Sequence, residues 1–243
     1  MSVQQRAIKA VPKSVALILI AGLCLQLAWQ ISRPRPTAYA EALVFPPDNR
    51  TLQALSLGEP IALSQLMTLY LQAFDNQPGI SIPFLDLDYD RVESWLARIL
   101  ELDSIGQYPL LMASHIYAQV PDTIKQRKML EFVYQQFFID PNRRWPWLAH
   151  AAIMAKHRLN DLPLALRYAQ AIRQYATAPD VPHWASQMPI FILEDMGEVE
   201  SAKILLGGLL VSGIVTDPHE IHLLTERLQQ LENEEKSSRV PKN

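Results

Sequence analysis

The sequence predicts an all-α protein, with an N-terminal transmembrane helix ahead of a body built from helices. Three observations lead to this fold class. Residues 15–31 form an uncharged apolar run, apolar residues elsewhere recur with helical spacing, and no segment alternates with the period of two typical of strands. Glycine supplies only 8 of 243 residues, which argues against hairpin-rich β folds, Rossmann turns and glycine-rich phosphate loops.

The transmembrane helix is expected at Val15–Ile31, after a basic N-terminal segment, residues 1–14. Its 17 residues are close to the minimum that crosses a bilayer, and Trp29 suits the membrane interface. A cleaved signal peptide is the alternative, because Ala38-Tyr39-Ala40 fits a cleavage site. That site lies far beyond the apolar run, so we expect an uncleaved anchor.

The charge of the chain is unevenly distributed. Residues 1–40 hold five of the 22 basic residues and none of the 25 acidic ones, so residues 41–243 carry a net charge of −8. Three basic residues precede the apolar run and two follow it, a bias that places the N-terminus inside. We therefore expect a single-pass protein of the bacterial inner membrane, with a cytoplasmic N-terminus and a periplasmic helical domain. Its acidic body excludes a general nucleic-acid binder.

The body is expected to span residues 61–231, between a proline-rich extended linker, 32–60, and a disordered polar tail, 232–243. Its first helix covers Ile61–Asp75, and a proline-glycine turn ends it. Asp90 and Glu93 form a capping box for the next helix, which runs to Leu102.

The remaining helices follow from apolar spacing and from their start and stop signals. Aspartates at 122 and 161 suit N-caps, the sequence 217–220 combines a cap, a proline and an acid, and Gly213 suits a C′ position. The helices are expected at Gln107–Gln119, from Asp122 to Phe138, at Trp145–Leu159, from Asp161 to Ile172, at His183–Met196, at Glu198–Ser212 and from Asp217 to Leu231. Gly207-Gly208 inside one of them costs about 1 kcal/mol per glycine relative to alanine, so either close packing compensates or that helix is weak.

A period of about 37 residues runs through the body, marked by aspartates between helices and by short turns followed by alanine. The aspartates are Asp103, Asp140 and Asp217, spaced by 37 and 77 residues; the turns are Asn160-Asp161 and Gly197-Glu198, ahead of Ala165 and Ala202, which lie 37 residues apart.

The order of Gly197, Ala202 and Asp217-Pro218 resembles the tetratricopeptide repeat (TPR) family, whose unit is a helical hairpin of about 34 residues. The resemblance covers about residues 90–230 and implies a right-handed superhelix of TPR-like hairpins, whose first helices line a concave surface. Units near 37 residues, a proline at 189 and a missing Trp-Leu-Gly pattern depart from the family. In outline the chain also resembles bacterial single-pass membrane proteins with a TPR-like domain, which implies no activity.

Two groups of residues are candidates for partner binding. Arg143, Arg144 and Trp147 stand at a repeat junction and could form a hot spot. Alternatively, the tryptophans fill the gap between repeats while the arginines stay in solvent. The second group lies opposite the apolar faces of successive first helices: Tyr108, His115, His150, His157, His183 and Gln187.

The second group is expected to face one groove, although ordinary exposed polar residues would show the same spacing. Four of its six members are histidines, whose reference pKa is about 6.5. We therefore expect the groove to gain positive charge near pH 6.

No motif indicates catalysis, a metal or a cofactor. The histidines of His219-Glu220-Ile221-His222 are three residues apart, whereas the zinc motif requires four. Asp86-x-Asp88-x-Asp90 lacks the glycine and the glutamate of a calcium loop. We therefore expect a membrane-anchored scaffold that binds a protein or peptide. The alternatives are an envelope enzyme with a carboxylate such as Glu194 as acid, and a permanent subunit of a membrane complex.

Overall fold

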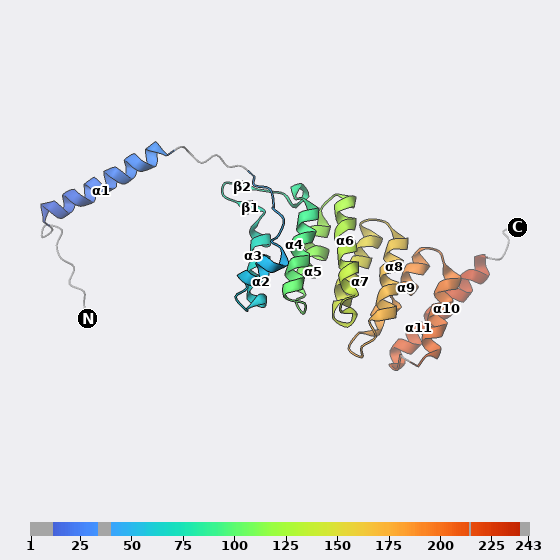
Figure 1. Ribbon diagram of the computed structural model, residues 1–243. Coiled ribbons are helices and arrows are strands. Elements are labelled where there is room, and N and C mark those ends of the chain that lie inside the picture. The colour runs from blue at the N-terminus through green and yellow to red at the C-terminus, as the bar shows by residue number, and fades with distance from the viewer. Residues whose placement is uncertain (1–11, 34–39, 214, 239–243) are drawn as a thin grey trace, which may run out of the picture. The chain divides into compact units, whose positions relative to one another are not determined.

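The computed structural model describes residues 12–33, 40–213 and 215–238 (Figure 1). Three parts of the predicted organisation lie outside the described residues. They are most of the basic segment, residues 34–39 of the linker, and the last five residues of the chain. Two residues of the possible cleavage site, Ala38 and Tyr39, are among them. The chain divides into two units: an N-terminal unit that contains the first helix, and a second unit, Glu41–Gln77 and Ser81–Asn243, here called the body.

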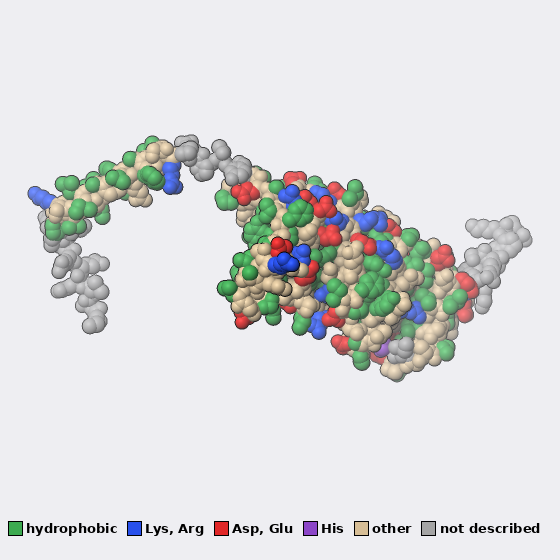
Figure 2. Space-filling model, in the orientation of Figure 1, with side chains coloured by type: hydrophobic (Ala, Val, Ile, Leu, Met, Phe, Trp, Pro, Cys, Tyr) green, Lys and Arg blue, Asp and Glu red, His purple; other side chains and the backbone are tan. Residues whose placement is uncertain are grey.

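The N-terminal unit contains α1, Lys13–Ser32, the one described helix that is long and apolar enough to cross a membrane. Its 20 residues correspond to about 30 Å, the thickness of a bilayer's hydrocarbon core. None of its side chains is buried, and hydrophobic side chains cover it between basic residues at its two ends (Figure 2). The Arg33 guanidinium lies 5.1 Å from the Trp29 ring, an arrangement suited to a membrane interface.

The body is a row of helices, from α2 and α3 at one end to α10 and α11 at the other (Figure 1). Each helix packs mainly against its neighbours in sequence, as expected for a stack of helical hairpins. The described elements of the body and its turn are α2 (Asn49–Leu55), α3 (Pro60–Ala73), the paired strands β1 (Asn76–Gln77) and β2 (Ile80–Ser81), η2 (Phe84–Asp86), α4 (Tyr89–Leu102), α5 (Tyr108–Leu111), η3 (Met112–Ile116), η4 (Tyr117–Gln119), α6 (Thr123–Phe137), α7 (Pro141–His157), α8 (Leu162–Tyr175), α9 (His183–Asp195), α10 (Val199–Val211) and α11 (Pro218–Ser238).

Aspartate caps start several of these helices. Asp122 accepts hydrogen bonds from the amides of Ile124 and Lys125, and Asp161 accepts one from Leu164, so both predicted caps are confirmed. The predicted cap at residue 90 is wrong by two positions. Asp88 caps α4 instead, because its carboxylate accepts from the backbone amides of the two residues that follow Tyr89.

The turns within two successive hairpins have the same backbone conformation. Asn160, between α7 and α8, has φ +51°, and Gly197, between α9 and α10, has φ +77°. Both residues are therefore left-handed, a conformation that glycine and asparagine tolerate best. Ala165 and Ala202, five residues after each turn, are completely buried. Equivalent positions thus recur 37 residues apart.

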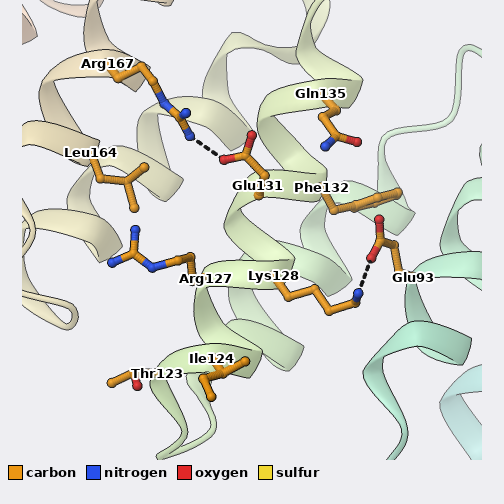
Figure 3. A pocket seen from close by; sticks show the side chains of 10 residues that line it. All are labelled: Glu93, Thr123, Ile124, Arg127, Lys128, Glu131, Phe132, Gln135, Leu164 and Arg167. Carbon is orange, nitrogen blue, oxygen red and sulfur yellow. Dashed lines mark hydrogen bonds and ion pairs between the residues drawn. The ribbon is translucent and has the colours of Figure 1, made fainter.

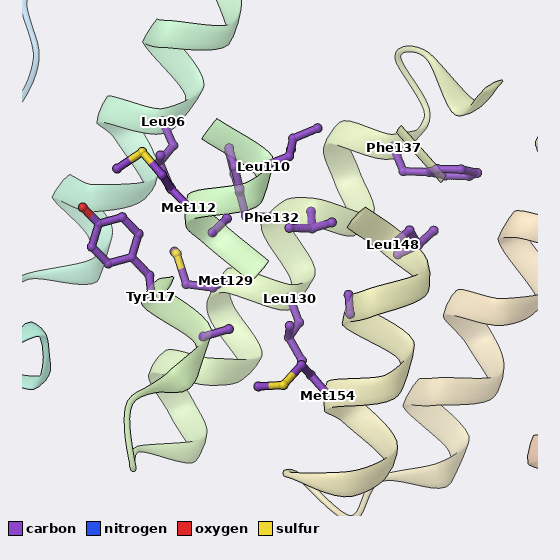
Figure 4. Close-up of a cluster of buried hydrophobic side chains, with 14 of the residues drawn as sticks. Leu96, Leu110, Met112, Tyr117, Met129, Leu130, Phe132, Phe137, Leu148 and Met154 are labelled. Atoms are coloured by element: carbon purple, nitrogen blue, oxygen red, sulfur yellow. The ribbon is translucent and has the colours of Figure 1, made fainter. Parts of the chain in front are cut away.

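The main core runs through the stack from α2 to α9, and α4, α5, η3, α6 and α7 converge in its middle (Figure 4). Large and small apolar side chains alternate there, with alanines where α7 and α8 approach each other. The fully buried side chains of this region include Leu96, Leu110, Met112, Tyr117, Met129, Leu130, Phe137 and Leu148. A smaller cluster joins α9, α10 and α11 around Leu206 and Leu231.

Part of the expected extended linker is packed against the body. Leu43 and Leu52 are each only 2% exposed, and α2 forms within this segment. Trp95 donates a 2.7 Å hydrogen bond to the Val44 carbonyl, and the Gln77 side chain bonds both the amide and the carbonyl of Glu41. Residues 41–60 therefore form a strap that the side chains of Trp95 and Gln77 hold, a contact that composition alone does not reveal.

The expected disordered tail also differs from the structure, because α11 continues to Ser238. Residues 232–238 are rich in glutamate, lysine and serine, and glutamate and lysine are good helix formers. The helix therefore extends beyond Leu231, which is buried.

Candidate binding surface

Two of the candidate residues, Tyr108 and His115, lie in or next to a π-helical turn. The segment expected as one helix, 107–119, consists of α5, the π-helical turn η3 and the 3₁₀ turn η4. The extra residue in a π turn rotates the residues that follow, and such turns are frequent at functional sites. Met112, the first residue of this turn, is buried, whereas His115 and Tyr108 are exposed as expected.

Two of the expected histidines are in contact. The rings of His115 in η3 and His150 in α7 are stacked, with centroids 3.5 Å apart and planes 15° apart. The Trp147 ring meets His115 edge-on at 5.9 Å, and its Nε1 donates a 2.6 Å hydrogen bond to Oε1 of Gln107. We call Gln107, His115, Trp147 and His150 the histidine–tryptophan cluster.

The hydrogen bonds of Ser114 define the proton position on His115. The Ser114 hydroxyl donates to the Leu110 carbonyl at 2.8 Å and lies 2.8 Å from Nδ1 of His115. A hydroxyl has one proton, so it must accept from His115, whose Nδ1 therefore carries hydrogen. The Nε2 of His115 is then an acceptor in the neutral ring.

Burial lowers the pKa of both stacked histidines, and His115 lowers that of His150 further through charge repulsion. Each ring therefore stays neutral to a lower pH than an ordinary histidine. The expectation of positive charge near pH 6 needs this correction, because burial, and for His150 also repulsion from His115, disfavours the imidazolium.

A pocket that no residue of the cluster lines was not anticipated from the sequence; Gly106 and Tyr108 in its wall are the chain neighbours of Gln107. It has a volume of about 410 Å³ and lies between α3, the loop before α5, and α5 itself. Tyr108 belongs to its wall, and the Tyr108 hydroxyl accepts a 2.5 Å hydrogen bond from Gln72. The other lining residues are Ser64, Gln65, Thr68, Leu69, Asp103, Gly106 and Pro109. Small polar residues on an otherwise apolar helix, such as Ser64 and Thr68, were the available signal.

The remaining members of the histidine group lie elsewhere. His157 ends α7 and His183 begins α9, and both are exposed. Gln187 is buried, contrary to the expectation of a groove residue, because its Nε2 donates a 2.5 Å hydrogen bond to Glu220 of α11. This contact joins α9 to α11 and gives Gln187 a structural function.

Arg144 is likewise not a surface residue. Its side chain is 1% exposed, and it donates to the Gln136 carbonyl at 2.7 Å, the Gln136 side chain at 3.1 Å and the Ser104 carbonyl at 3.0 Å. Arg144 thereby ties α7 to the end of α6 and to the loop after α4, and burial lowers its pKa. Arg143, by contrast, is exposed and pairs with Asp140 at 3.2 Å.

A second, charged groove of about 690 Å³ crosses α4, α6 and α8 (Figure 3). Its three cations are each paired: Lys128 with Glu93 at 3.0 Å, Arg127 with Asp161 at 2.6 Å, and Arg167 with Glu131. Charges of both signs are interspersed on the face of the body where these helices lie (Figure 2). These pairs link neighbouring helices, and the groove carries balanced charge.

The carboxylate considered as a catalytic acid, Glu194, is held by Arg227 of α11, with Nε of the arginine 3.1 Å from Oε2. This ion pair joins α9 to α11.

Comparison of the chain with family models, curated proteins and solved structures finds no match.

Proposed function

We propose that this chain is a membrane-anchored helical-repeat scaffold, which binds a protein or peptide partner without catalysing a reaction. In this proposal α1 is retained as a single-pass anchor in a bacterial inner membrane. The excess of basic residues before the apolar run supports a cytoplasmic N-terminus and a periplasmic body.

The body is proposed to be a TPR-like right-handed superhelix. Support comes from the equivalent left-handed turns at Asn160 and Gly197, each followed by a buried alanine five residues later. The contacts between sequence neighbours add to this support, since repeat proteins bury their apolar faces by stacking. In such a stack α5 with η3, α7 and α9 are first helices, and α6, α8 and α10 are second helices.

The single observation that carries the binding function is the histidine–tryptophan cluster. Two first helices bring together an indole, two imidazoles and an amide, and the chain neighbours of Gln107, Gly106 and Tyr108, line a pocket. Aromatic residues in partly buried positions are the usual anchors of protein interfaces. Their lowered pKa keeps the histidines uncharged at neutral pH, so the surface suits a peptide with apolar side chains and free backbone groups.

Site-specific photo-cross-linking in intact membranes tests this function. A photoreactive benzophenone amino acid replaces Tyr108 or His115 in turn, and a matched control replaces Ile124, an exposed residue of the charged groove. We expect a discrete protein adduct from positions 108 and 115 and none from 124. Absence of adducts at both cluster positions, or identical adducts at all three, would contradict the proposal.

A substitution within the cluster provides the second arm. Trp147→Phe keeps an aromatic ring but removes the donor to Gln107, and Trp147→Ala removes the ring as well. We expect the adduct at position 115 to weaken in the first variant and to disappear in the second. An unchanged adduct in Trp147→Ala, in a protein that still melts cooperatively, would show that the cluster does not bind the partner.

A further inference from the structure

The pocket of Tyr108 has one charged residue in its walls, Asp103. The walls are formed by α3, the loop 103–107 and α5, and in these described segments Asp103 is the only acidic or basic residue. The volume of about 410 Å³ lies within the range of pockets that hold small ligands, which is about 300–1,000 Å³. A carboxylate with no cation in the same walls makes the pocket complementary to a positively charged group.

The two carboxylate oxygens of Asp103 have different surroundings. Oδ1 accepts hydrogen bonds from the amides of Ile105 at 3.2 Å and Gly106 at 3.0 Å, and so holds the loop in its turn. Oδ2 accepts no hydrogen bond from the described residues. Glycine at position 106 gives this oxygen its room, because a Cβ there would lie 2.8 Å from Oδ2. The turn is therefore held through Oδ1, and Oδ2 is left to accept from a ligand.

The rest of the wall suits a side chain with an apolar stem and a donor at its end. The Thr68 hydroxyl donates its proton to the Ser64 carbonyl at 2.8 Å, so toward a ligand the Thr68 oxygen acts as an acceptor. Leu69, Pro109 and the ring of Tyr108 form the apolar part of the wall. Methylene stems of long basic side chains pack on apolar surfaces of this kind while their charged ends reach polar groups.

Lysine matches these acceptors better than arginine. A guanidinium binds best when it donates to both oxygens of a carboxylate, but Oδ1 of Asp103 already accepts from two amides. A lysine ammonium is a compact charge with three donors, which suit one carboxylate oxygen and a hydroxyl such as that of Thr68. The net charge of −8 over residues 41–243 attracts a basic partner at longer range.

We propose that the pocket of Tyr108 binds a lysine side chain of the partner. This inference rests on the proposed function and gives its partner a chemical signature, a lysine in addition to the segment that contacts the histidine–tryptophan cluster. Tyr108 of the pocket directly follows Gln107 of the cluster in the chain, so one partner can contact both.

Saturation-transfer NMR with single-residue probes tests the pocket without the partner. The probe is Nα-acetyl-lysine N-methylamide, and the norleucine analogue has a similar stem without the charge. Both are titrated against the full-length protein in a non-ionic detergent, with empty micelles as the blank. We expect the lysine probe to bind about tenfold more tightly than the norleucine probe, because only lysine donates a charge-assisted hydrogen bond. The arginine analogue should bind more weakly than lysine.

Substitutions in the loop separate the charge from its position. Asp103→Asn retains Oδ1 and therefore the turn, and it should remove the preference for lysine over norleucine. Gly106→Ala retains the charge but displaces Oδ2, so it should also weaken binding of the lysine probe. Asp86→Asn removes an exposed carboxylate elsewhere and is the matched control, which should bind as the natural protein does.

Three results would overturn the lysine pocket. They are equal binding of the lysine and norleucine probes, lysine binding that Asp103→Asn leaves intact, and no saturation transfer to the lysine probe above that of empty micelles. Tighter binding of the arginine analogue would overturn the choice of lysine.

The photo-cross-linking assay connects the pocket to the partner. Asp103→Asn should weaken the adduct formed from position 115, and an unchanged adduct would overturn the assignment of the pocket to the partner's lysine. The two proposals fail separately, because the probes need no partner. Lysine binding without adducts would contradict the proposed function, whereas adducts without lysine binding would contradict the pocket.

Discussion

Arg144 offers the sharpest test of how the stack is held together. Its guanidinium satisfies two backbone carbonyls, of Gln136 and Ser104, in a site that is 1% exposed. Arg144→Ala leaves both acceptors without a donor and opens a cavity at the junction of α4, α6 and α7. An unsatisfied buried acceptor costs about 1–3 kcal/mol, and part of this cost is recovered because the arginine charge no longer has to be buried. We expect the free energy of unfolding to fall by about 2–4 kcal/mol.

The assay is urea unfolding of the full-length protein in detergent micelles, followed by tryptophan fluorescence. Arg143→Ala is the matched control, because this neighbouring arginine forms an exposed ion pair with Asp140 and its loss should cost less than about 1 kcal/mol. Arg144→Lys keeps the charge but cannot reach both carbonyls, so we expect an intermediate loss. If Arg144→Ala costs no more than Arg143→Ala, the structural function assigned to Arg144 is wrong.

Three further outcomes follow from the structure. Acidification from about pH 7 to pH 5.5 should lower the free energy of unfolding of the natural protein more than that of the double variant His115→Gln, His150→Gln. Both rings have a lowered pKa in the folded protein and bind protons near pH 6.5 once it unfolds, so acid favours the unfolded state. Urea titrations at both pH values check this, and equal losses in the two proteins would contradict it. Gly207→Ala and Gly208→Ala should each raise the free energy of unfolding by about 0.5–1 kcal/mol, since an added Cβ meets nothing within 4 Å at either site. A lower free energy of unfolding in either variant would show that the added methyl group does not fit there. Asn142→Ala should cost about 1–2 kcal/mol because its side chain accepts from two backbone amides before α9 at 2.9 and 3.0 Å, and Asn142→Asp should retain most of that stability; equal unfolding midpoints for the two variants would contradict this function.

Local signals in the sequence predict most of the helices. The caps at Asp122 and Asp161 and the left-handed Gly213 depend on short stretches of chain, so pattern and turn chemistry suffice to find them. The start of α7 was missed by four residues, because Pro146 inside the helix made the preceding turn look irregular. Pro146 is the sixth residue of α7 and has no N–H to donate to the Asn142 carbonyl, so locally it indicates a helix end rather than a helix interior.

The features that depend on distant contacts could not be read from the sequence. The burial of Arg144 depends on a carbonyl 40 residues earlier, at Ser104, and no local pattern marks such a partner. The stacking of His115 and His150 joins η3 to α7, elements that lie far apart in the sequence, and no local pattern marks that contact. The strap over residues 41–44 likewise becomes visible only through the side chain of Trp95. The helical period did place both histidines on outward faces, but it could not show that the two rings touch.

Hydrogen–deuterium exchange tests the central claim, that the histidine–tryptophan cluster and the pocket of Tyr108 bind a partner at the membrane. Exchange is measured on the protein in its native membranes and again after purification to homogeneity. The account predicts slower exchange in membranes for the amides of residues 103–119 and 145–153, with little change in 123–137, which line the charged groove. Equal exchange of the cluster segments in both preparations, or protection confined to 123–137, would contradict it.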